Sequence, residues 1–299
     1  MIDILIIGSG PAGLTAAMYA ARARLSHIVV EKDYMGSGAI AVTEQVDNFP
    51  GLYGISGYDL GEKFREHAER FGTEIKNAEA AQILKTESGF KTRFKDGSEI
   101  DSKTVIYAAG TSYRRLEVEG DKLLGVSYCA TCDGAFYQNK TVAVVGGGDT
   151  ALTDALHLAK IAEKVYLIHR RDEFRANKSL AERVRISSNI EPVLSAMPVK
   201  IIGDKHVSGM ELSQNGKPLT LDVNGVFVAI GSIPNTAPLK GLVELDERGY
   251  VKALEDGATS LPGFYAAGDV RTKALRQVIT ACADGACCVD SIERFLNLN

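Results

Sequence analysis

The sequence predicts an α/β fold made of two units with largely parallel sheets, the second inserted into the first. An apolar strand, a glycine-rich turn, a helix and a second strand follow one another from residue 4, and the same order recurs from residue 141. A later apolar element at residues 264–269 has no glycine-rich turn of its own, so we expect it to return the chain to the first unit. Strand, turn, helix and parallel strand form the right-handed βαβ unit of doubly wound sheets.

The first copy has a strand over residues 4–7, the turn Gly-Ser-Gly-Pro-Ala-Gly over 8–13, a helix over 14–24 and a strand over 27–30. In such a turn the first glycine permits the bend, the second lets a pyrophosphate approach the backbone, and the third lets helix and strand pack closely. Glu31 follows the second strand, where a carboxylate accepts hydrogen bonds from ribose hydroxyls. The first copy therefore predicts a Rossmann-like site for FAD or NAD.

The second copy has a strand over residues 141–145, the turn Gly-Gly-Gly-Asp-Thr-Ala over 146–151, a helix over about 151–161 and a strand over 164–168. Alanine takes the third place of the fingerprint and is small enough to keep helix and strand close. This copy is a second Rossmann-like unit.

Basic residues follow the second copy, where the first copy has Glu31. They are His169, Arg170, Arg171 and, one helical turn on, Arg175. Guanidinium groups match phosphate oxygens bidentately, whereas a carboxylate would repel a 2′-phosphate. This pattern favours NADP(H); the alternative is a solvated basic cluster over residues 170–185.

The domain boundaries are set by these repeats. Residues 1–113 and 241–299 form a discontinuous FAD-binding domain, and residues 114–240 form an inserted NAD(P)H-binding domain, each with a three-layer ββα architecture. Residues 73–108 are rich in strands, and Asp96-Gly97 predicts a hairpin turn between two of them. Proline and glycine residues break regular structure where the chain crosses between the domains, near residues 111–116 and 235–243.

A cysteine pair, Cys129 and Cys132, stands just before the second copy and is followed directly by Asp133. The spacing allows a small disulfide loop, and a helix beginning there would stabilise a thiolate. A neighbouring carboxyl group can move the proton that thiol–disulfide exchange requires. A zinc site needs four ligands that the sequence does not supply nearby, and two inert thiols are the remaining alternative. Beside two nucleotide sites, the pair predicts a flavin-to-dithiol relay.

Composition narrows the classes of partner. The 299 residues carry a formal net charge of −4, with 45% hydrophobic and 24% charged residues. There is no basic excess that would indicate nucleic acid or an anionic membrane, and no apolar run approaches the roughly 20 residues of a membrane span. The N-terminus lacks the pattern of a signal peptide, so a cytoplasmic location is expected.

These motifs together resemble the low-molecular-weight thioredoxin reductases along essentially the whole chain. The resemblance rests on the two glycine turns, the Val-Asp-Asn-Phe-Pro-Gly run at 46–51, the Cys-Ala-Thr-Cys-Asp-Gly run at 129–134, the run at 169–176 and Gly-Asp-Val-Arg at 268–271. It implies a homodimer with one FAD per chain, reduced by NADPH, that passes electrons through Cys129–Cys132 to a thioredoxin-like protein. It also implies that the NADP domain rotates about the two crossings.

The resemblance further implies roles for individual residues. Cys132 would face the flavin, Cys129 would attack the protein substrate and Asp133 would be the acid/base, with no metal site. FAD contacts would come from Gly8, Gly10, Pro11, Ala12, Gly13, Glu31, Thr43, Asn48, Gly268, Asp269, Gln277 and Val278. NADPH contacts would come from Gly146, Gly148, Asp149, Thr150, His169, Arg170, Arg171 and Arg175.

Several positions depart from the family pattern and leave alternatives open. The loop at residues 36–40, Ser232, Asp154 and Leu275 all differ from the customary residues. Some relatives take electrons from reduced ferredoxin and no longer use NADPH, although Arg170, Arg171 and Arg175 argue against that here. A flavoprotein redox sensor without turnover is a more remote alternative.

Three further cysteines lie on a predicted C-terminal helix. Cys282, Cys287 and Cys288 are mixed with alanines there, so we expect all three to be small buried core residues; a peripheral redox role is the alternative.

Overall fold

The chain divides into two compact units. The computed structural model describes residues 1–32, 38–43, 46 and 48–298. Unit 1 comprises Met1–Ser112 and Ile233–Asn299, and unit 2 comprises Tyr113–Ser232. The two crossing segments, β7 (Thr111–Tyr113) and β16 (Ser232–Pro234), pair as a two-stranded sheet. The boundaries that the sequence predicts are at 113/114 and 240/241.

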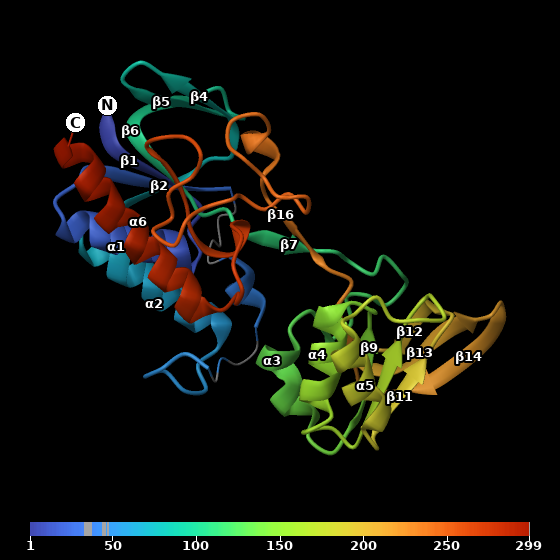
Figure 1. The fold of residues 1–299 in the computed structure, drawn as a ribbon. Helices are drawn as coiled ribbons and strands as arrows, with labels where there is room; N and C mark the ends of the chain where they lie inside the picture. The colour runs from blue at the N-terminus through green and yellow to red at the C-terminus, as the bar shows by residue number, and fades with distance from the viewer. Residues whose placement is uncertain (33–37, 44–45, 47, 299) are drawn as a thin grey trace. The chain divides into compact units, whose positions relative to one another are not determined.

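Unit 1 is built on a seven-stranded sheet in the order β3-β2-β1-β6-β5-β4, with β17 also paired to β6 (Figure 1). β1 pairs in parallel with β2 and β6, and β17 also runs parallel to β6, so the late strand does return the chain to this sheet. β4, β5 and β6 are antiparallel, which confirms the predicted hairpin. The strands are β1 (Ile2–Ile7), β2 (His27–Glu31), β3 (Glu74–Asn77), β4 (Ala80–Thr86), β5 (Gly89–Phe94), β6 (Glu99–Tyr107) and β17 (Phe264–Ala266).

Alternate residues of β1 pack into two separate hydrophobic cores, because successive side chains of a strand point to opposite faces of the sheet. Ile4 and Ile6 pack with the helices, whereas Leu5 and Ile7 pack with β5, β6 and β17 side chains such as Phe264. All four are at most 6% exposed. Residues 4–7 of this strand are therefore all apolar, as expected for a sheet covered on both faces.

Three helices lie on the same side of this sheet (Figure 1): α1 (Pro11–Arg22), α2 (Gly57–Arg70) and α6 (Val278–Leu298). α1 begins at residue 11, three residues before the predicted start, because proline is well suited to the first helical position. α1 and α6 pack very closely. A Cβ atom added at Gly285 of α6 would overlap the carbonyl oxygen of Ala12, so this contact requires glycine.

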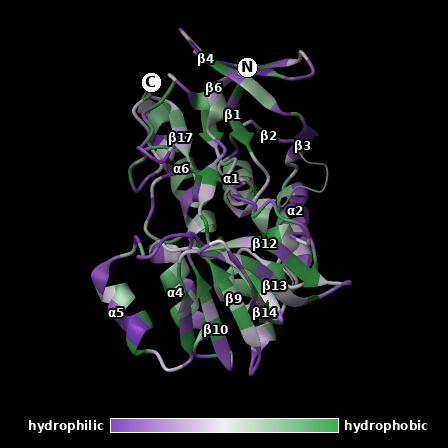
Figure 2. Cartoon of the chain, turned by 90° about the vertical axis from the view of Figure 1, so that its right-hand side faces the viewer, coloured by the Kyte–Doolittle hydropathy of each residue, from purple (hydrophilic) through white to green (hydrophobic). Residues whose placement is uncertain are grey.

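Unit 2 repeats the plan with a five-stranded parallel sheet in the order β11-β10-β9-β15-β8. Val142 and Val144 of β9 face a helical core, whereas Ala143 and Val145 face a core shared with a three-stranded antiparallel sheet (Figure 2). The parallel strands are β8 (Val126–Ser127), β9 (Thr141–Val145), β10 (Lys164–Ile168), β11 (Ile190–Val193) and β15 (Gly225–Val228). The antiparallel strands are β12 (Ala196–Gly203), β13 (Val207–Gln214) and β14 (Lys217–Asp222), and the helices are α3 (Ala130–Asp133), α4 (Asp149–Leu158) and α5 (Lys178–Ile186).

Short 3₁₀ segments complete the connections. They are η1 (Gly38–Val42), η2 (Gly134–Tyr137), η3 (Ala237–Leu239) and η4 (Gly268–Val270). η4 directly follows β17, and it carries Asp269. The carboxyl end of a parallel strand, where ligands of doubly wound sheets bind, therefore leads straight into this segment.

We expect Gly285→Ala to destabilise unit 1 by about 1–3 kcal/mol, because the added methyl group meets backbone atoms of α1 that cannot rotate away. The midpoint of thermal unfolding checks this. Ala283→Ser, at an exposed position of the same helix, is the matched control and should change stability by no more than about 0.5 kcal/mol. Equal midpoints for the two variants would contradict the close contact.

Candidate redox and nucleotide-binding sites

Cys129 and Cys132 form a disulfide, with their Cα atoms 5.3 Å apart. Cys129 is the N-cap of the short helix α3, and Cys132 lies in its single turn. The carbonyl oxygen of Cys129 accepts hydrogen bonds from the backbone N–H groups of Cys132 and Asp133, at 3.2 and 3.1 Å. Both cysteines are partly exposed. The predicted pair is thus joined by a disulfide that solvent can reach.

Ser127 connects the backbone of Cys129 to the side chain of Asp133, a link that the sequence did not indicate. Its hydroxyl donates to Asp133 Oδ2 at 2.6 Å and accepts from the backbone N–H of Cys129 at 3.1 Å. Ser127 is 6% exposed, and it ends β8, which pairs with β15 of the unit 2 sheet. The carboxyl group that follows the disulfide is therefore held in place by a buried hydroxyl group on a fixed strand.

The glycine turn of unit 2 joins β9 to α4. Gly146 has a φ of +156°, and a Cβ atom there would overlap the carbonyl oxygen of Ala229, so this first position requires glycine. Gly148 is the N-cap of α4, with open space around it and no side-chain cap. The first N–H groups of α4 therefore remain available to an anion, as in other phosphate-binding turns.

Charged side chains lie around this turn. Arg170, Arg171 and Arg175 are exposed, and none of them forms an ion pair with another residue in the part of the chain that the structure describes. Thr150 is also exposed. Asp149 differs, because its carboxylate already accepts a hydrogen bond from the backbone N–H of Asn177 at 2.7 Å.

The glycine turn of unit 1 joins β1 to α1 in the same way. Cβ atoms at Gly8 and Gly13 would overlap the carbonyl oxygens of Ala108 and Gly8 respectively, so both positions require glycine. Gly10 is the N-cap of α1, again without a side-chain cap, and Pro11 and Ala12 open the helix. Glu31 reaches back to this turn and accepts hydrogen bonds from the backbone N–H and the hydroxyl group of Ser9, at 2.8 and 3.0 Å.

Residues far apart in the sequence meet near the start of α6. Asn48 Nδ2 donates to Gln277 Oε1 at 2.9 Å, and Val278 packs with the small core around Leu60. Asp269 Oδ1 is buried without a hydrogen-bond partner in the described part of the chain, and burial raises the pKa of this carboxyl group. Thr43 uses its carbonyl oxygen to accept from the N–H of Gly57, at 2.9 Å.

A buried ion cluster supports η4, and the sequence did not reveal it. Asp284 of α6 accepts hydrogen bonds from the backbone N–H of Gly268 at 2.9 Å, from Arg271 at 2.9 Å and from Lys273 at 2.7 Å. The side chains of all three charged residues are at most 10% exposed. Arg271 also donates to the carbonyl oxygen of Leu254 at 2.7 Å. The two ends of the segment that carries Asp269 are thus fixed to α6.

The C-terminal cysteines differ from one another in exposure. All three do lie on α6, but only Cys288 is buried, with its pKa raised by burial. Cys287 is exposed, so the expectation that it belongs to the core was wrong; it falls on the solvent face of the helix. Residues 36, 37 and 47, which belong to the unusual loop and to the run at 46–51, lie outside the described residues.

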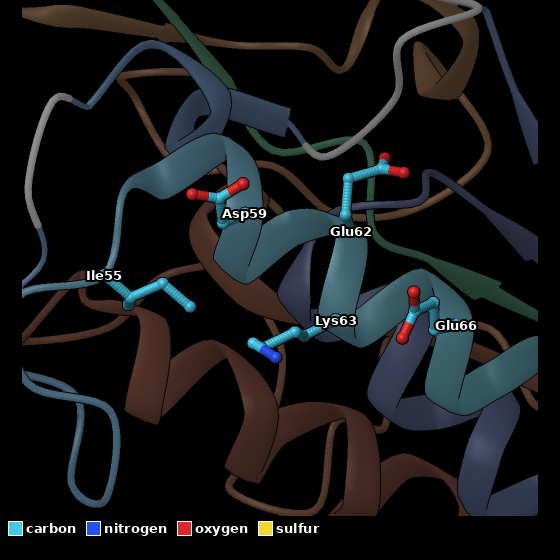
Figure 3. Close-up of a pocket in the computed structure, with 5 residues that line it drawn as sticks. All are labelled: Ile55, Asp59, Glu62, Lys63 and Glu66. Carbon is cyan, nitrogen blue, oxygen red and sulfur yellow. The ribbon is translucent and has the colours of Figure 1, made fainter.

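A surface hollow of about 340 Å³ lies on α2 and is lined by Ile55, Asp59, Glu62, Lys63 and Glu66 (Figure 3). Figure 3 shows Asp59, Glu62, Lys63 and Glu66 spread along this helix, with Ile55 on the segment that precedes it. No group of three or more potential metal ligands occurs within the described ranges, and none of the helices there is long and apolar enough to cross a membrane.

Comparisons with known proteins agree with this geometry. Residues 2–285 match the model of the pyridine nucleotide-disulphide oxidoreductases. The chain belongs to this family. It is 43% identical to a thioredoxin reductase of Mycolicibacterium smegmatis, over 98% of this chain and 96% of the relative. Its fold is similar to the crystal structure of thioredoxin reductase from Streptococcus pyogenes, with a TM-score of 0.93, 37% identity and coverage of 100% and 99% of the two chains.

The chain is also similar to a solved structure whose name includes ferredoxin as an electron donor, rather than NADPH. It is a ferredoxin-flavin thioredoxin reductase from Clostridium acetobutylicum, 33% identical, with a TM-score of 0.55 over 100% and 99% of the two chains. The relatives named here share the words thioredoxin reductase, and only the C. acetobutylicum protein has an electron donor in its name. The comparisons therefore indicate the disulfide substrate of the reaction more firmly than its electron donor.

We expect Ser127→Ala to slow the reduction of a small-molecule disulfide about tenfold, because Asp133 loses a hydrogen bond to its charged form. Single-turnover kinetics with a chemically reduced enzyme checks this. Ser208→Ala, at an exposed serine of the same unit, is the control, and Ser127→Thr should restore most of the rate. An unchanged rate in Ser127→Ala would leave Ser127 with a purely structural role.

We expect Asp284→Asn to weaken FAD binding to the apoprotein by about tenfold or more. The substitution leaves Arg271 and Lys273 buried without their carboxylate, which loosens η4 and the position of Asp269. Titration of flavin fluorescence measures the Kd. Asp290→Asn removes an exposed ion pair from the same helix and should leave the Kd unchanged; the same Kd in both variants would separate the cluster from flavin binding.

Proposed function

We propose that this chain is a flavin-dependent thioredoxin-disulfide reductase that takes electrons from NADPH and delivers them through Cys129 and Cys132 to a thioredoxin-like protein. The observation that carries the proposal is the partly exposed disulfide in the same unit as a glycine turn flanked by exposed arginines. The similarity to named thioredoxin reductases over the whole chain supports the choice of a protein disulfide as substrate.

The residues of unit 1 fit FAD. The uncapped N-terminus of α1, at Gly10, offers free N–H groups to a pyrophosphate, and Glu31 stands where a ribose would be bound. Asp269 Oδ1 is a buried acceptor without a partner in the described part of the chain, and it would gain one from a hydroxyl group of the bound ligand. Asn48 and Gln277 lie together beside the start of α6. When bound, FAD supplies a group that accepts a hydride and passes on two electrons.

The residues of unit 2 fit NADPH. Gly148 leaves open space at the uncapped N-terminus of α4 for a pyrophosphate. Arg170, Arg171 and Arg175 offer exposed guanidinium groups without acidic partners in the described ranges, and a 2′-phosphate is an anion that such groups bind bidentately.

The thiol chemistry uses the reduced form of the cysteine pair. The thiolate of Cys129 attacks the disulfide of the substrate protein, one substrate sulfur leaves as a thiolate, and a mixed disulfide forms. Asp133 is placed to move the proton, with Ser127 holding its carboxyl group. The thiolate of Cys132 then attacks Cys129, which releases the second substrate thiol and restores the Cys129–Cys132 disulfide. The substrate gains two electrons and two protons.

A homodimer, which the resemblance implies, and a cytoplasmic location, which the N-terminal sequence led us to expect, are parts of this proposal. The alternative donor is reduced ferredoxin, and the C. acetobutylicum structure and the unusual Ser232 and Leu275 keep it as a second candidate. Ferredoxin has no 2′-phosphate, so its use as the donor would not explain why three exposed arginines lie around a nucleotide-binding turn. We therefore favour NADPH.

We expect the purified enzyme to consume NADPH when an oxidised thioredoxin is added, and NADPH alone to bleach the flavin under anaerobic conditions. Absorbance of the reduced nicotinamide and of the flavin follows both. Cys132→Ser should keep FAD yet lose disulfide reduction, at least about a thousandfold, because no second thiol resolves the mixed disulfide. Cys287→Ser, at the exposed cysteine of α6, is the matched control and should keep full activity.

Two results would contradict the proposal in different ways. No bleaching by NADPH, but bleaching by reduced ferredoxin, would assign the alternative donor. Full turnover in Cys132→Ser would remove the cysteine pair from the electron path.

A further inference from the structure

The middle glycine of the unit 2 turn is required by a side chain of the protein itself. A Cβ atom added at Gly147 would overlap the imidazole ring of His169, whereas Gly148 beside it has open space. A pyrophosphate therefore has room at Gly148. The missing side chain at Gly147 instead lets His169, the residue that follows β10, lie directly on the turn.

His169 is packed into this place. The residue is 8% exposed, and its ring stacks on Phe174 with centroids 5.8 Å apart and planes at 29°. Its Nε2 atom is buried and has no hydrogen-bond partner among the described residues. Burial lowers the pKa of the ring, and the neighbouring guanidinium groups of Arg170, Arg171 and Arg175 lower it further. The ring thus packs directly on the turn.

Backbone hydrogen bonds hold the rest of this segment, residues 169–177, which we call the arginine loop. The N–H of Arg175 donates to the carbonyl oxygen of Gly147 at 2.7 Å. The N–H of Asn177 donates to the carboxylate of Asp149, also at 2.7 Å. On the other side, the N–H of Ser195 donates to the carbonyl oxygen of Arg171 at 2.9 Å. The backbone of the loop is hydrogen-bonded to the turn and to the connection between β11 and β12, while its three arginine side chains are exposed.

We propose that His169 and Asp149 are positioning residues that dock the arginine loop on the glycine turn and thereby create the preference for a nucleotide with a 2′-phosphate. This inference rests on the proposed use of NADPH and assigns roles within that site. His169 acts by filling the space above Gly147, and Asp149 acts as an acceptor for the backbone of the loop. Neither side chain needs to touch the nucleotide.

The physical basis is pre-organisation. Arginine side chains lose conformational freedom when they bind a phosphate, and a loop that also had to become ordered would add to that cost. A loop whose backbone is already docked on the turn does not pay this additional entropy cost when the phosphate binds. The turn receives the pyrophosphate and the loop receives the 2′-phosphate, so fixing one on the other fixes the distance between the two anion sites.

Two pairs of variants separate positioning from direct contact. His169→Ala opens the space over Gly147, whereas His169→Phe keeps an aromatic ring and removes both nitrogen atoms. Asp149→Ala removes the acceptor, whereas Asp149→Asn keeps an acceptor oxygen and removes the charge. Arg185→Ala is the matched control, because Arg185 is an exposed arginine of α5 outside the loop whose charge pairs with Glu182.

The measurement is calorimetric titration of the FAD-loaded enzyme with adenosine 2′,5′-bisphosphate and with ADP, which lacks the 2′-phosphate, supported by KM values for NADPH and NADH. We expect both alanine variants to lose about 10- to 100-fold in their preference for the 2′-phosphorylated ligand, while binding of ADP stays within about threefold. His169→Phe, Asp149→Asn and Arg185→Ala should each retain the wild-type preference within about threefold.

Each contrary result has its own meaning. An alanine variant that keeps the preference overturns the positioning role of that residue. A His169→Phe variant that loses as much as His169→Ala overturns positioning in favour of a direct polar contact. Wild-type enzyme with no preference for the 2′-phosphate overturns the proposed use of NADPH itself, and this outcome is distinct from both. If His169→Ala does not fold, the Asp149 pair decides the matter.

Discussion

Both units depend on the same steric constraint in the glycine turn. The end of a neighbouring strand places a backbone carbonyl group where a side chain of the turn would otherwise lie. The carbonyl oxygen of Ala108 does this at Gly8, and that of Ala229 does it at Gly146. Both glycines have positive φ values, +109° and +156°. This close approach brings the end of the first strand, the start of the following helix and the end of the adjacent strand to one point. The nucleotide-binding groups of each unit are arranged around such a point.

Under the proposed function, the same turn binds two different ligands because the residues at the end of the second strand of each unit differ. In unit 1 the strand β2 ends with Glu31, whose carboxylate accepts hydrogen bonds from Ser9 and so lies against the turn. In unit 2 the first residue after β10 is His169, whose ring covers Gly147 and is followed by exposed arginines. In both units a residue at the carboxyl end of this strand contacts the turn. A carboxylate there favours hydroxyl groups, and an aromatic ring followed by guanidinium groups favours a phosphate.

Local features were predictable from the sequence, and tertiary contacts were not. The strands at 141–145 and 164–168 fall where the apolar runs and glycine turns placed them, since such strands read as continuous apolar segments. Ser127 and Asp284 gave no signal, because a serine near a strand end and an aspartate in a helix acquire meaning only from partners that folding brings together. The prediction for Cys287 was wrong because its neighbour Cys288 is buried while it is not, and a one-residue step on a helix turns a side chain by about 100°.

The charge of the arginine loop favours an anionic ligand, which packing of the loop alone would not do. Three exposed guanidinium groups lie within one short segment of a chain with a net charge of −4, and none has an ion-pair partner in the described ranges. Like charges held close together repel one another, and docking of the backbone prevents the loop from spreading to relieve this repulsion. Fixed guanidinium groups without ion-pair partners in the described ranges, in the same unit as the uncapped N-terminus of α4, suit a ligand with two separate anionic groups, and a 2′-phosphorylated dinucleotide has that arrangement.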